Sequence, residues 1–226
     1  MADSENARWF ITDLCDTLYR SNTTFDFARF VAARRGAMWP LYVQLISSRR
    51  SPAFYALAAF WRFASIDLSK LLVLKAFTGL SATQLDLLAD DFVRHSLQPL
   101  RIPEAWSELY EARAKGEQIL ILSASVRPVV AAVARSIGAS FAASELAHHP
   151  KTGLATGELQ TDLTGRKHLH LTTMRLDPRT IECVMTDNIT DFELMKLGRR
   201  RIAIIHNQKA HSKWAPLSPK LIYTIQ

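Results

Sequence analysis

Four short apolar runs constrain most strongly how this chain can fold. Each is only a few residues long and apolar almost throughout; they are Trp9–Thr12, Ile119–Leu122, Ile181–Met185 and Ile202–Ile205. Such runs are typical of strands that are buried on both faces of a sheet. Because helical signals lie between the later runs, the alternation predicts an α/β fold built on a Rossmann-like, doubly wound parallel sheet.

Proline and glycine mark the helices on either side of the second run. Pro103 begins a segment that ends before Gly116, and Pro128 lies in the first turn of a segment that stops at Gly138. Proline at the start and glycine beyond the end is the usual asymmetry of a helix. After the third run, Thr190–Glu193 has the pattern of a capping box, which predicts another helix there.

Residues 20–102 form a long insertion between the first run and the second. The segment is far too long for a loop of a compact domain, and a capping box at Ser81–Gln84 precedes apolar residues at helical spacing. Further helices are predicted over Phe25–Arg35, Met38–Ser47 and Pro52–Phe63. We therefore predict a Rossmann-like core of residues 1–19 and 103–226 with a helical cap of residues 20–102. Leu221–Ile225 is a candidate edge strand.

Composition narrows the classes of protein to which the chain could belong. Hydrophobic residues make up 48% of the chain and charged residues 22%, which is typical of a folded globular protein. Two well-separated cysteines, Cys15 and Cys183, do not form the disulfide framework of a small secreted domain, so we expect a reducing, cytoplasmic location. We see no signal-peptide pattern. The most apolar stretch, Pro52–Trp61, is too short to span a bilayer, so we expect no transmembrane segment; contact with a membrane surface stays open.

The net charge of +7 falls mostly in residues 20–102. A basic region attracts phosphates, nucleic acid or an anionic membrane surface. The basic residues here are interspersed with apolar helix faces and form no dense stripe, so we expect no nucleic-acid partner. A nucleic-acid-binding module is the rival interpretation, and a salt-dependent gel shift would test it.

Three of the runs are followed closely by a polar residue, namely Asp13, Ser123 and Asp187. Ligands of an open parallel sheet bind outside the carboxyl ends of its strands, so we expect these side chains to converge. A carboxylate such as Asp13 can attack a phosphoryl group, and two aspartates offer the hard oxygen ligands that suit Mg²⁺. Ser123 can donate a hydrogen bond to a phosphoryl oxygen, and Lys167, at the head of a helical stretch, can balance the charge. The pattern therefore predicts a Mg²⁺ cofactor and a small phosphorylated substrate.

Taken in chain order, these residues resemble the motifs of the haloacid dehalogenase-like (HAD) superfamily. Asp13–Leu18 is similar to the first motif, Asp-x-Asp-x-Thr-Leu, and the apolar strand that ends at Ser123 is similar to the second. Lys167 fits the third motif and Asp187–Asp191 the fourth. The resemblance covers residues 8–206, and the helical insertion after the first motif looks most like the phosphoserine-phosphatase-like branch.

The resemblance implies Mg²⁺-dependent phosphoryl transfer through an aspartyl-phosphate, beneath a mobile helical cap. Asp13 would be the nucleophile and a metal ligand, with the backbone carbonyl of Cys15 and the side chain of Asp187 as further ligands. Asp191 would be either a metal ligand or a carboxylate behind the ligands. The residues that would bind the phosphoryl group are Ser123, Ala124 and Lys167.

The chain departs from the family pattern at Cys15. The family's second aspartate usually protonates the leaving group and then activates water, and Asp16 is one residue too far along to replace it. An ordinary thiol is protonated at neutral pH, so it could donate a proton but would be a poor base. This predicts slow hydrolysis of the aspartyl-phosphate, a substrate with a good leaving group, or transfer to an acceptor other than water. The alternative is a HAD-fold binding protein with impaired catalysis, in which Cys15 is a small buried filler.

Some other features bear on the substrate. Arg20 and Asn22 follow the first motif and are candidates to bind the substrate from the hinge of the cap. The aromatic residues of Phe54–Phe63 are typical of a helical core, but they would favour an ester with an apolar tail if they lined the cap. A hydrolytic dehalogenase is a further family alternative, which Asp187 and Asp191 disfavour because that chemistry needs no metal. The sequence does not indicate the oligomeric state.

Overall fold

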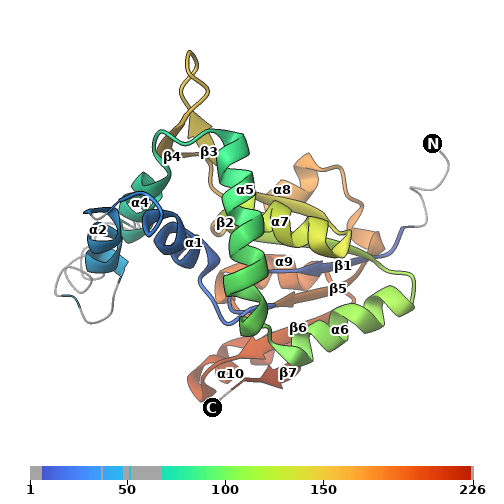
Figure 1. Cartoon of the computed structure of the whole chain (residues 1–226). Helices are drawn as coiled ribbons and strands as arrows, with labels where there is room; N and C mark the ends of the chain where they lie inside the picture. The colour runs from blue at the N-terminus through green and yellow to red at the C-terminus, as the bar shows by residue number, and fades with distance from the viewer. Residues whose placement is uncertain (1–6, 37, 48–50, 52–67, 225–226) are drawn as a thin grey trace.

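A seven-stranded sheet forms the centre of the molecule (Figure 1). The computed structural model describes residues 7–36, 38–47, 51 and 68–224. The strand order is β4-β3-β2-β1-β5-β6-β7, and all neighbouring strands run parallel except β3 and β4. The strands are β1 (Trp9–Thr12), β2 (Gln118–Val126), β3 (Ser140–His148), β4 (Ala155–Thr161), β5 (Ile181–Thr186), β6 (Arg200–Ile205) and β7 (Lys220–Tyr223). The predicted α/β fold with a Rossmann-like parallel sheet is confirmed, and β7 is the edge strand expected near the end of the chain.

Side chains that alternate along the strands build a hydrophobic core on each face of the sheet. Phe10 and Ile121 belong to the core that includes α6 and α7, whereas Ile11 and Leu122 belong to the core that includes α8, α9 and α10. Burial on both faces explains why these strands are apolar throughout. The helices of the two faces are α6 (Pro103–Ala114), α7 (Arg127–Ile137), α8 (Lys167–Thr173), α9 (Phe192–Leu197) and α10 (Gln208–Trp214), with short 3₁₀ turns η4 (Pro178–Thr180), η5 (Ile189–Asp191) and η6 (Ala215–Leu217).

The helix ends around the second strand are confirmed. α6 begins at Pro103 and ends before Gly116, and Gly138 adopts the left-handed conformation, with φ of 58°, that terminates α7. Glycine adopts this conformation without the steric cost that a side chain adds. Among the described helices, none is both long and apolar enough to cross a membrane.

The capping box predicted at Thr190–Glu193 is wrong. The turn η5 precedes α9, and the side chain of Asn188 caps this turn by accepting a hydrogen bond from the Thr190 amide, at 3.0 Å. The chain enters the helix only after Asp191, whose carboxylate is directed into the protein and caps nothing. Asn188 therefore caps this segment, while Asp191 binds Lys167.

The described part of the insertion is helical. It holds α1 (Thr23–Ala32), α2 (Met38–Ser47), α4 (Leu68–Leu74), α5 (Ala82–Phe92), the 3₁₀ turns η1 (Lys75–Phe77) and η3 (Gln98–Leu100), and the π-helical turn η2 (Val93–Leu97). The capping box at Ser81–Gln84 is confirmed by bonds in both directions. The predicted helix over Pro52–Phe63 lies outside the described residues. Because apolar side chains of α1 and α5 join the same core as α6 and α7, the division into core and cap stays a prediction.

Strands β3 and β4 form an antiparallel hairpin that the sequence analysis did not predict. The hairpin contacts the insertion directly: the Gly79 amide donates to the carbonyl of Ala155, and the Ala155 amide donates to the carbonyl of Leu80, both at 2.8 Å. Gly157 approaches so closely that an added Cβ would lie 2.4 Å from Oγ1 of Thr78. The insertion therefore rests on the hairpin at one edge of the sheet (Figure 1).

Candidate functional site

Asp13 lies directly after β1, at the carboxyl end of the central strand. Its backbone amide donates to the carbonyl of Met185 on β5, at 3.0 Å, and its Oδ1 accepts a hydrogen bond from the Leu14 amide, at 2.7 Å. Both bonds hold a buried carboxylate in one orientation. The carboxylate thus stands at the edge where parallel sheets bind their ligands.

Lys167 is the first residue of α8, and its ammonium group lies between two carboxylates. Its Nζ is 2.7 Å from Oδ2 of Asp13 and 2.7 Å from Oδ2 of Asp191, and all three side chains are buried. Burial alone would lower the pKa of Lys167, but the two carboxylates outweigh this effect and raise that pKa. The ammonium group is therefore charged at neutral pH.

Asp191 makes its contacts with Lys167 and with Thr186, whose hydroxyl donates to Oδ2 of Asp191 at 2.8 Å. Its other oxygen, Oδ1, is buried and has no hydrogen-bond partner among the described residues. Burial raises the pKa of Asp191, while the charge of Lys167 acts in the opposite direction. The sequence analysis gave Asp191 two possible roles, as a metal ligand or as a carboxylate behind the ligands. In the structure, Oδ2 of Asp191 binds Lys167.

Asp187 follows β5 and lies close enough to Asp13 for their charges to interact. Its Oδ1 accepts a hydrogen bond from Oγ1 of Thr17, at 3.0 Å. Burial, followed by the charges of Asp13 and Asp16, raises the pKa of Asp187 to about 8. Burial is the largest of these causes, and the two neighbouring carboxylates add to it; a hard divalent cation would relieve both the burial of charge and the repulsion.

The residues fit a Mg²⁺ site that uses few protein ligands. Among the described residues, no three His, Cys, Asp or Glu side chains are grouped so as to hold a metal ion. The predicted set does not need such a group, because it combines the carboxylates of Asp13 and Asp187 with the backbone carbonyl of Cys15. Mg²⁺ commonly binds one or two carboxylates and completes its coordination with water and substrate phosphate. The observation that favours this assignment is that Asp13 and Asp187 follow two neighbouring parallel strands, β1 and β5, and so lie at the same end of the sheet.

The thiol of Cys15 belongs to a chain of hydroxyl groups. Its Sγ lies 2.9 Å from Oγ1 of Thr23, which donates to Oγ of Ser125 at 2.7 Å. The Ser125 hydroxyl also lies 3.0 Å from Oγ1 of Thr24. Burial, followed by the charge of Asp13, raises the pKa of Cys15 to about 12. The thiol is thus protonated at neutral pH and is a hydrogen-bonding member of this chain.

A cavity of about 290 Å³ opens beside these groups. The predicted site residues that line it are Asp13, Cys15, Asn22, Ser123, Ala124 and Lys167. Asp187 and Asp191 are not part of the lining, although the neighbouring Asn188 and Thr190 are. The structure does not bring Arg20 to this cavity, because that side chain is exposed and the Arg20 amide bonds to the carbonyl of Leu100.

Ser123 lies inside β2, whereas the sequence analysis placed it at the end of the strand. The pairing of β2 with β1 ends at Ile121, and the pairing with β3 is irregular between Leu122 and Val126. Ser123 therefore extends past the end of β1 while the backbone is still a strand. Its Oγ accepts a hydrogen bond from the Ser125 amide, at 3.3 Å, and the buried hydroxyl faces the cavity.

Several residues of the lining were missed by the sequence analysis; they are Thr24, Phe25, Lys70, Ser125, Thr164, Gly165, Asn188 and Thr190. Those next to a motif could have been found by their adjacency to Ser123, Lys167 or Asp187. Lys70 could not, because it lies on α4 of the insertion, where no motif marks it.

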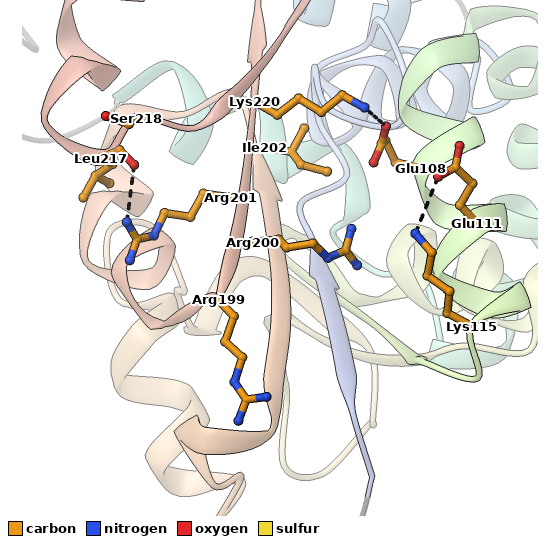
Figure 2. A pocket seen from close by; sticks show the side chains of 10 residues that line it. All are labelled: Glu108, Glu111, Lys115, Arg199, Arg200, Arg201, Ile202, Leu217, Ser218 and Lys220. Atoms are coloured by element: carbon orange, nitrogen blue, oxygen red, sulfur yellow. Dashed lines mark hydrogen bonds and ion pairs between the residues drawn. The ribbon is translucent and has the colours of Figure 1, made fainter.

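A larger pocket of about 450 Å³ lies at the other end of the strands from this cavity (Figure 2). Arg200 and Lys220, which begin β6 and β7, place it at the amino ends of the strands. These two cations are already paired, Arg200 with Glu117 and Lys220 with Glu108. None of the predicted site residues lines this pocket, so the smaller cavity is the candidate active site.

The fold and the site together define a class: α/β proteins with a carboxylate after the first strand and a buried lysine beside it. A sequence model of the family described as haloacid dehalogenase-like hydrolase matches residues 10–196. The chain belongs to this family, and the family predicted from the motifs is confirmed. No curated protein gives a significant sequence match to the chain.

Solved structures share the fold at low sequence identity. A protein with unknown function from Bordetella pertussis Tohama I has a TM-score of 0.76 and 19% identity, over 96% of this chain and 98% of its own. A probable phosphoserine phosphatase from Vibrio cholerae has a TM-score of 0.63 and 12% identity, over 96% of this chain and 61% of its own. A phosphoserine phosphatase holding a phospho-aspartyl intermediate analogue has a TM-score of 0.58 and 14% identity, over 96% and 92%. The fold is therefore that of phosphoserine-phosphatase-like members of the family.

Proposed function

We propose that this protein is a Mg²⁺-dependent phosphohydrolase or phosphotransferase that acts on small phosphate esters through an aspartyl-phosphate at Asp13. The observation that supports this most is the Lys167 ammonium group, held 2.7 Å from Oδ2 of Asp13 in the wall of a cavity of about 290 Å³. Membership of a hydrolase family agrees with it, and phosphoserine phosphatases among the structural neighbours favour phosphate esters.

Each residue has a role in this proposal. The carboxylate of Asp13 attacks phosphorus, and the bond between phosphorus and the ester oxygen breaks. Ser123 and Lys167 bind the phosphoryl oxygens and compensate the charge that develops on them. A bound Mg²⁺, held by Asp13, Asp187 and the backbone carbonyl of Cys15, would neutralise charge between the carboxylates and the phosphate. Asp191 orients Lys167.

Cys15 determines the step that we expect to be slow. Removal of the phosphoryl group from Asp13 requires a base that activates water. The pKa of Cys15 is raised to about 12, so at neutral pH almost none of the side chain is the thiolate that could act as this base. We therefore propose slow hydrolysis of the aspartyl-phosphate, an ester with a good leaving group, or an acceptor other than water.

The test is Mg²⁺-dependent release of phosphate from p-nitrophenyl phosphate and from a panel of phosphorylated metabolites. Asp13→Asn should abolish release, because the amide neither attacks phosphorus nor binds the metal. Asp177→Asn is the matched control, since Asp177 is bonded to Arg179 at the protein surface. Release that needs no Mg²⁺, or that persists in Asp13→Asn, would contradict the proposal.

A second candidate function is a HAD-fold binding protein with impaired catalysis, and the raised pKa of Cys15 favours it. The two functions differ in covalent chemistry. Acid quenching of the protein with a reactive phosphate donor, followed by mass spectrometry, should show one added phosphoryl group that Asp13→Asn lacks. If wild type binds phosphate esters but neither releases phosphate nor gains this mass, the binding protein is the correct function.

We further propose a cytoplasmic location and no nucleic-acid partner. Both cysteines are free, as expected for a reducing compartment. The residues that suggested an apolar tail on the substrate, Phe54–Phe63, lie outside the described residues. The described cavity is lined by many polar side chains and by Phe25, yet more of its exposed lining is apolar than polar, which is compatible with a small phosphate ester that carries an apolar tail.

A further inference from the structure

Lys70 extends from α4 of the insertion to the candidate active site. Its side chain is only 12% exposed, and it lines the same cavity as Asp13 and Lys167. Its Nζ donates to Oδ1 of Asp162 at 2.9 Å, to Oγ1 of Thr164 at 2.9 Å and to the carbonyl of Ala124 at 3.4 Å. An ammonium group is costly to remove from water unless it is paired and hydrogen-bonded, so these three acceptors help to hold the side chain in place.

The acceptors of Lys70 belong to the two segments that carry the phosphoryl-binding residues. Ala124 is next to Ser123 on β2, and Asp162 and Thr164 lie in the short connection between β4 and Lys167. Oδ1 of Asp162 also accepts bonds from the Thr164 amide, at 2.9 Å, and the Thr164 hydroxyl, at 2.7 Å. The carboxylate of Asp162 therefore stabilises the turn in this connection and links the connection to Lys70 of the insertion.

We propose that Lys70 is a positioning residue: its ion pair with Asp162 ties the insertion to the connection that ends in Lys167, and so fixes the Lys167 ammonium group beside Asp13. The inference rests on the proposed function, because it assigns to Lys70 a part in the same phosphoryl-transfer site. Lys70 acts through Asp162 and Thr164 and does not itself need to touch the phosphoryl group.

The chain offers a matched control for this proposal. Lys75, on η1, pairs with Glu158 of β4 at 3.0 Å, so it also joins the insertion to the hairpin. Its side chain is 41% exposed and that of Glu158 66%, and neither residue lines the cavity. Exposed ion pairs contribute little to stability. A comparison of Lys70→Met with Lys75→Met therefore separates the cavity pair from a general link between insertion and hairpin.

The kinetic test measures Mg²⁺-dependent hydrolysis of p-nitrophenyl phosphate by the full-length Lys70→Met, Lys70→Arg and Lys75→Met proteins. We expect Lys70→Met to lower kcat by about tenfold or more with a smaller change in KM, because a displaced catalytic group costs rate more than binding. Lys70→Arg should recover part of the loss, and Lys75→Met should stay within about twofold of wild type. An unchanged kcat, or a raised KM at constant kcat, would overturn the proposal.

A second measurement needs no substrate and so separates this proposal from the proposed function. Hydrogen exchange of the backbone amides in residues 162–171 should be faster in Lys70→Met than in wild type and unchanged in Lys75→Met. If wild type is inactive but this difference is present, the proposed function fails while the link between Lys70 and the Lys167 connection is supported. Equal exchange in all three proteins overturns the link.

Discussion

Asp13, Lys167 and Asp191 hold two negative charges and one positive charge in a buried position, which leaves an excess of one negative charge. Asp187 adds a further carboxyl group, whose pKa is raised to about 8 by burial and by the charges of Asp13 and Asp16, so another negative charge is costly here. A phosphate ester would bring still more negative charge. Phosphate and a divalent cation should therefore bind together, since each reduces the electrostatic cost of the other.

Replacement of Cys15 by aspartate tests whether the lack of a base at this position slows the reaction. The carboxylate would stand where the family places its acid and base, and general acid–base catalysis is typically worth about 10²–10⁴-fold in rate. We expect Cys15→Asp to raise the turnover of a phosphate monoester toward that range. Cys15→Ser, which also lacks a base, should not. The measurement is steady-state phosphate release with saturating Mg²⁺, and equal turnover in both variants would contradict the assignment of the slow step to Cys15.

The stability of the folded protein should depend on pH through the ionisation of Asp162. Burial alone would raise the pKa of Asp162, but hydrogen bonds from Thr164 and the pairing with Lys70 outweigh it and lower that pKa below 3.8. The folded state then binds this proton less readily than the unfolded state. The resulting stability is complete above about pH 4 and is lost as the pH falls through the lower pKa of the folded state.

Asp162→Asn should therefore unfold at lower urea concentration than wild type at pH 7, and the difference should shrink as the pH falls below about 4. The measurement is urea unfolding at several pH values. Asp177→Asn is the control, because the pKa of Asp177 is also lowered, by Arg179. The two carboxylates are equally exposed, but the partner of Asp177 is 88% exposed and that of Asp162 only 12%, so solvent screens the Asp177 pair more strongly. A difference at Asp162 that is constant across the whole pH range would show that the ionised carboxylate contributes nothing.

Individual site residues were predictable where strand geometry places them. Asp13 follows β1 and Lys167 begins α8, whereas Ser123 lies inside β2 just past the last residue paired with β1; the fold brings all three to one cavity. Lys70 could not be found, since its role depends on the packing of α4 against the connection near Asp162, which no local pattern encodes. Arg20 illustrates the converse: it is near Asp13 in sequence, yet its side chain is exposed away from the cavity.

At the scale of elements, predictions succeeded where burial makes the sequence repetitive. β1, β5 and β6 are apolar because both faces are covered, and each was found at close to its observed bounds. The hairpin of β3 and β4 was missed because its strands are rich in alanine, serine and threonine, with charged residues such as Glu145 and Glu158 exposed along them. An edge hairpin that is partly covered by the insertion has no continuous apolar run to detect.

Gly157 tests whether the hairpin supports the insertion. An added Cβ would lie 2.4 Å from Oγ1 of Thr78 and 2.9 Å from Cα of Lys75. Gly153 has a similar left-handed backbone, with φ of 68° against 72°, but nothing within 4 Å of its added Cβ. Alanine at either position has the backbone cost of about 1–2 kcal/mol, and only Gly157→Ala adds overpacking, of about 1–3 kcal/mol.

We therefore expect Gly157→Ala to lower the free energy of unfolding by about 1–3 kcal/mol more than Gly153→Ala does. Urea unfolding of the two variants measures this difference directly, because the backbone strain is common to both. Equal losses would mean that the hairpin and η1 can separate without cost, and the close packing of insertion on hairpin would then be wrong.

At the scale of the whole molecule, the carboxyl ends and the amino ends of the strands carry different groups of side chains. The carboxyl edge gathers carboxylates and Lys167 around a cavity, and the resulting imbalance of charge makes it suited to bind ions. The amino edge is held by ion pairs between α6, the start of β2 and the starts of β6 and β7, as Figure 2 shows in part. Because β1 and β5 lie between β2 and β6, the pair of Glu117 with Arg200 spans the centre of the sheet.

The Glu117–Arg200 pair should therefore matter more to stability than its partly exposed position suggests. Arg200 donates to both oxygens of Glu117, at 2.8 and 2.9 Å, and the side chain of Glu117 is only 4% exposed. Arg200→Met would leave this carboxylate buried without its cation, at a cost of about 1–3 kcal/mol. Arg199→Met is the neighbouring control, since Arg199 is 63% exposed and its partner Glu182 is 16% exposed, against 4% for Glu117, so a smaller loss is expected.

Urea unfolding at pH 7 should rank the variants in that order, and combining Arg200→Met with Glu117→Leu should recover part of the loss, because the double variant leaves no buried charge behind. If the double variant is less stable than Arg200→Met, Glu117 stabilises the protein through contacts other than its bonds to Arg200. If Arg200→Met and Arg199→Met are equally stable, the amino edge does not depend on this ion pair, and the apolar cores on the two faces alone set the stability of the sheet.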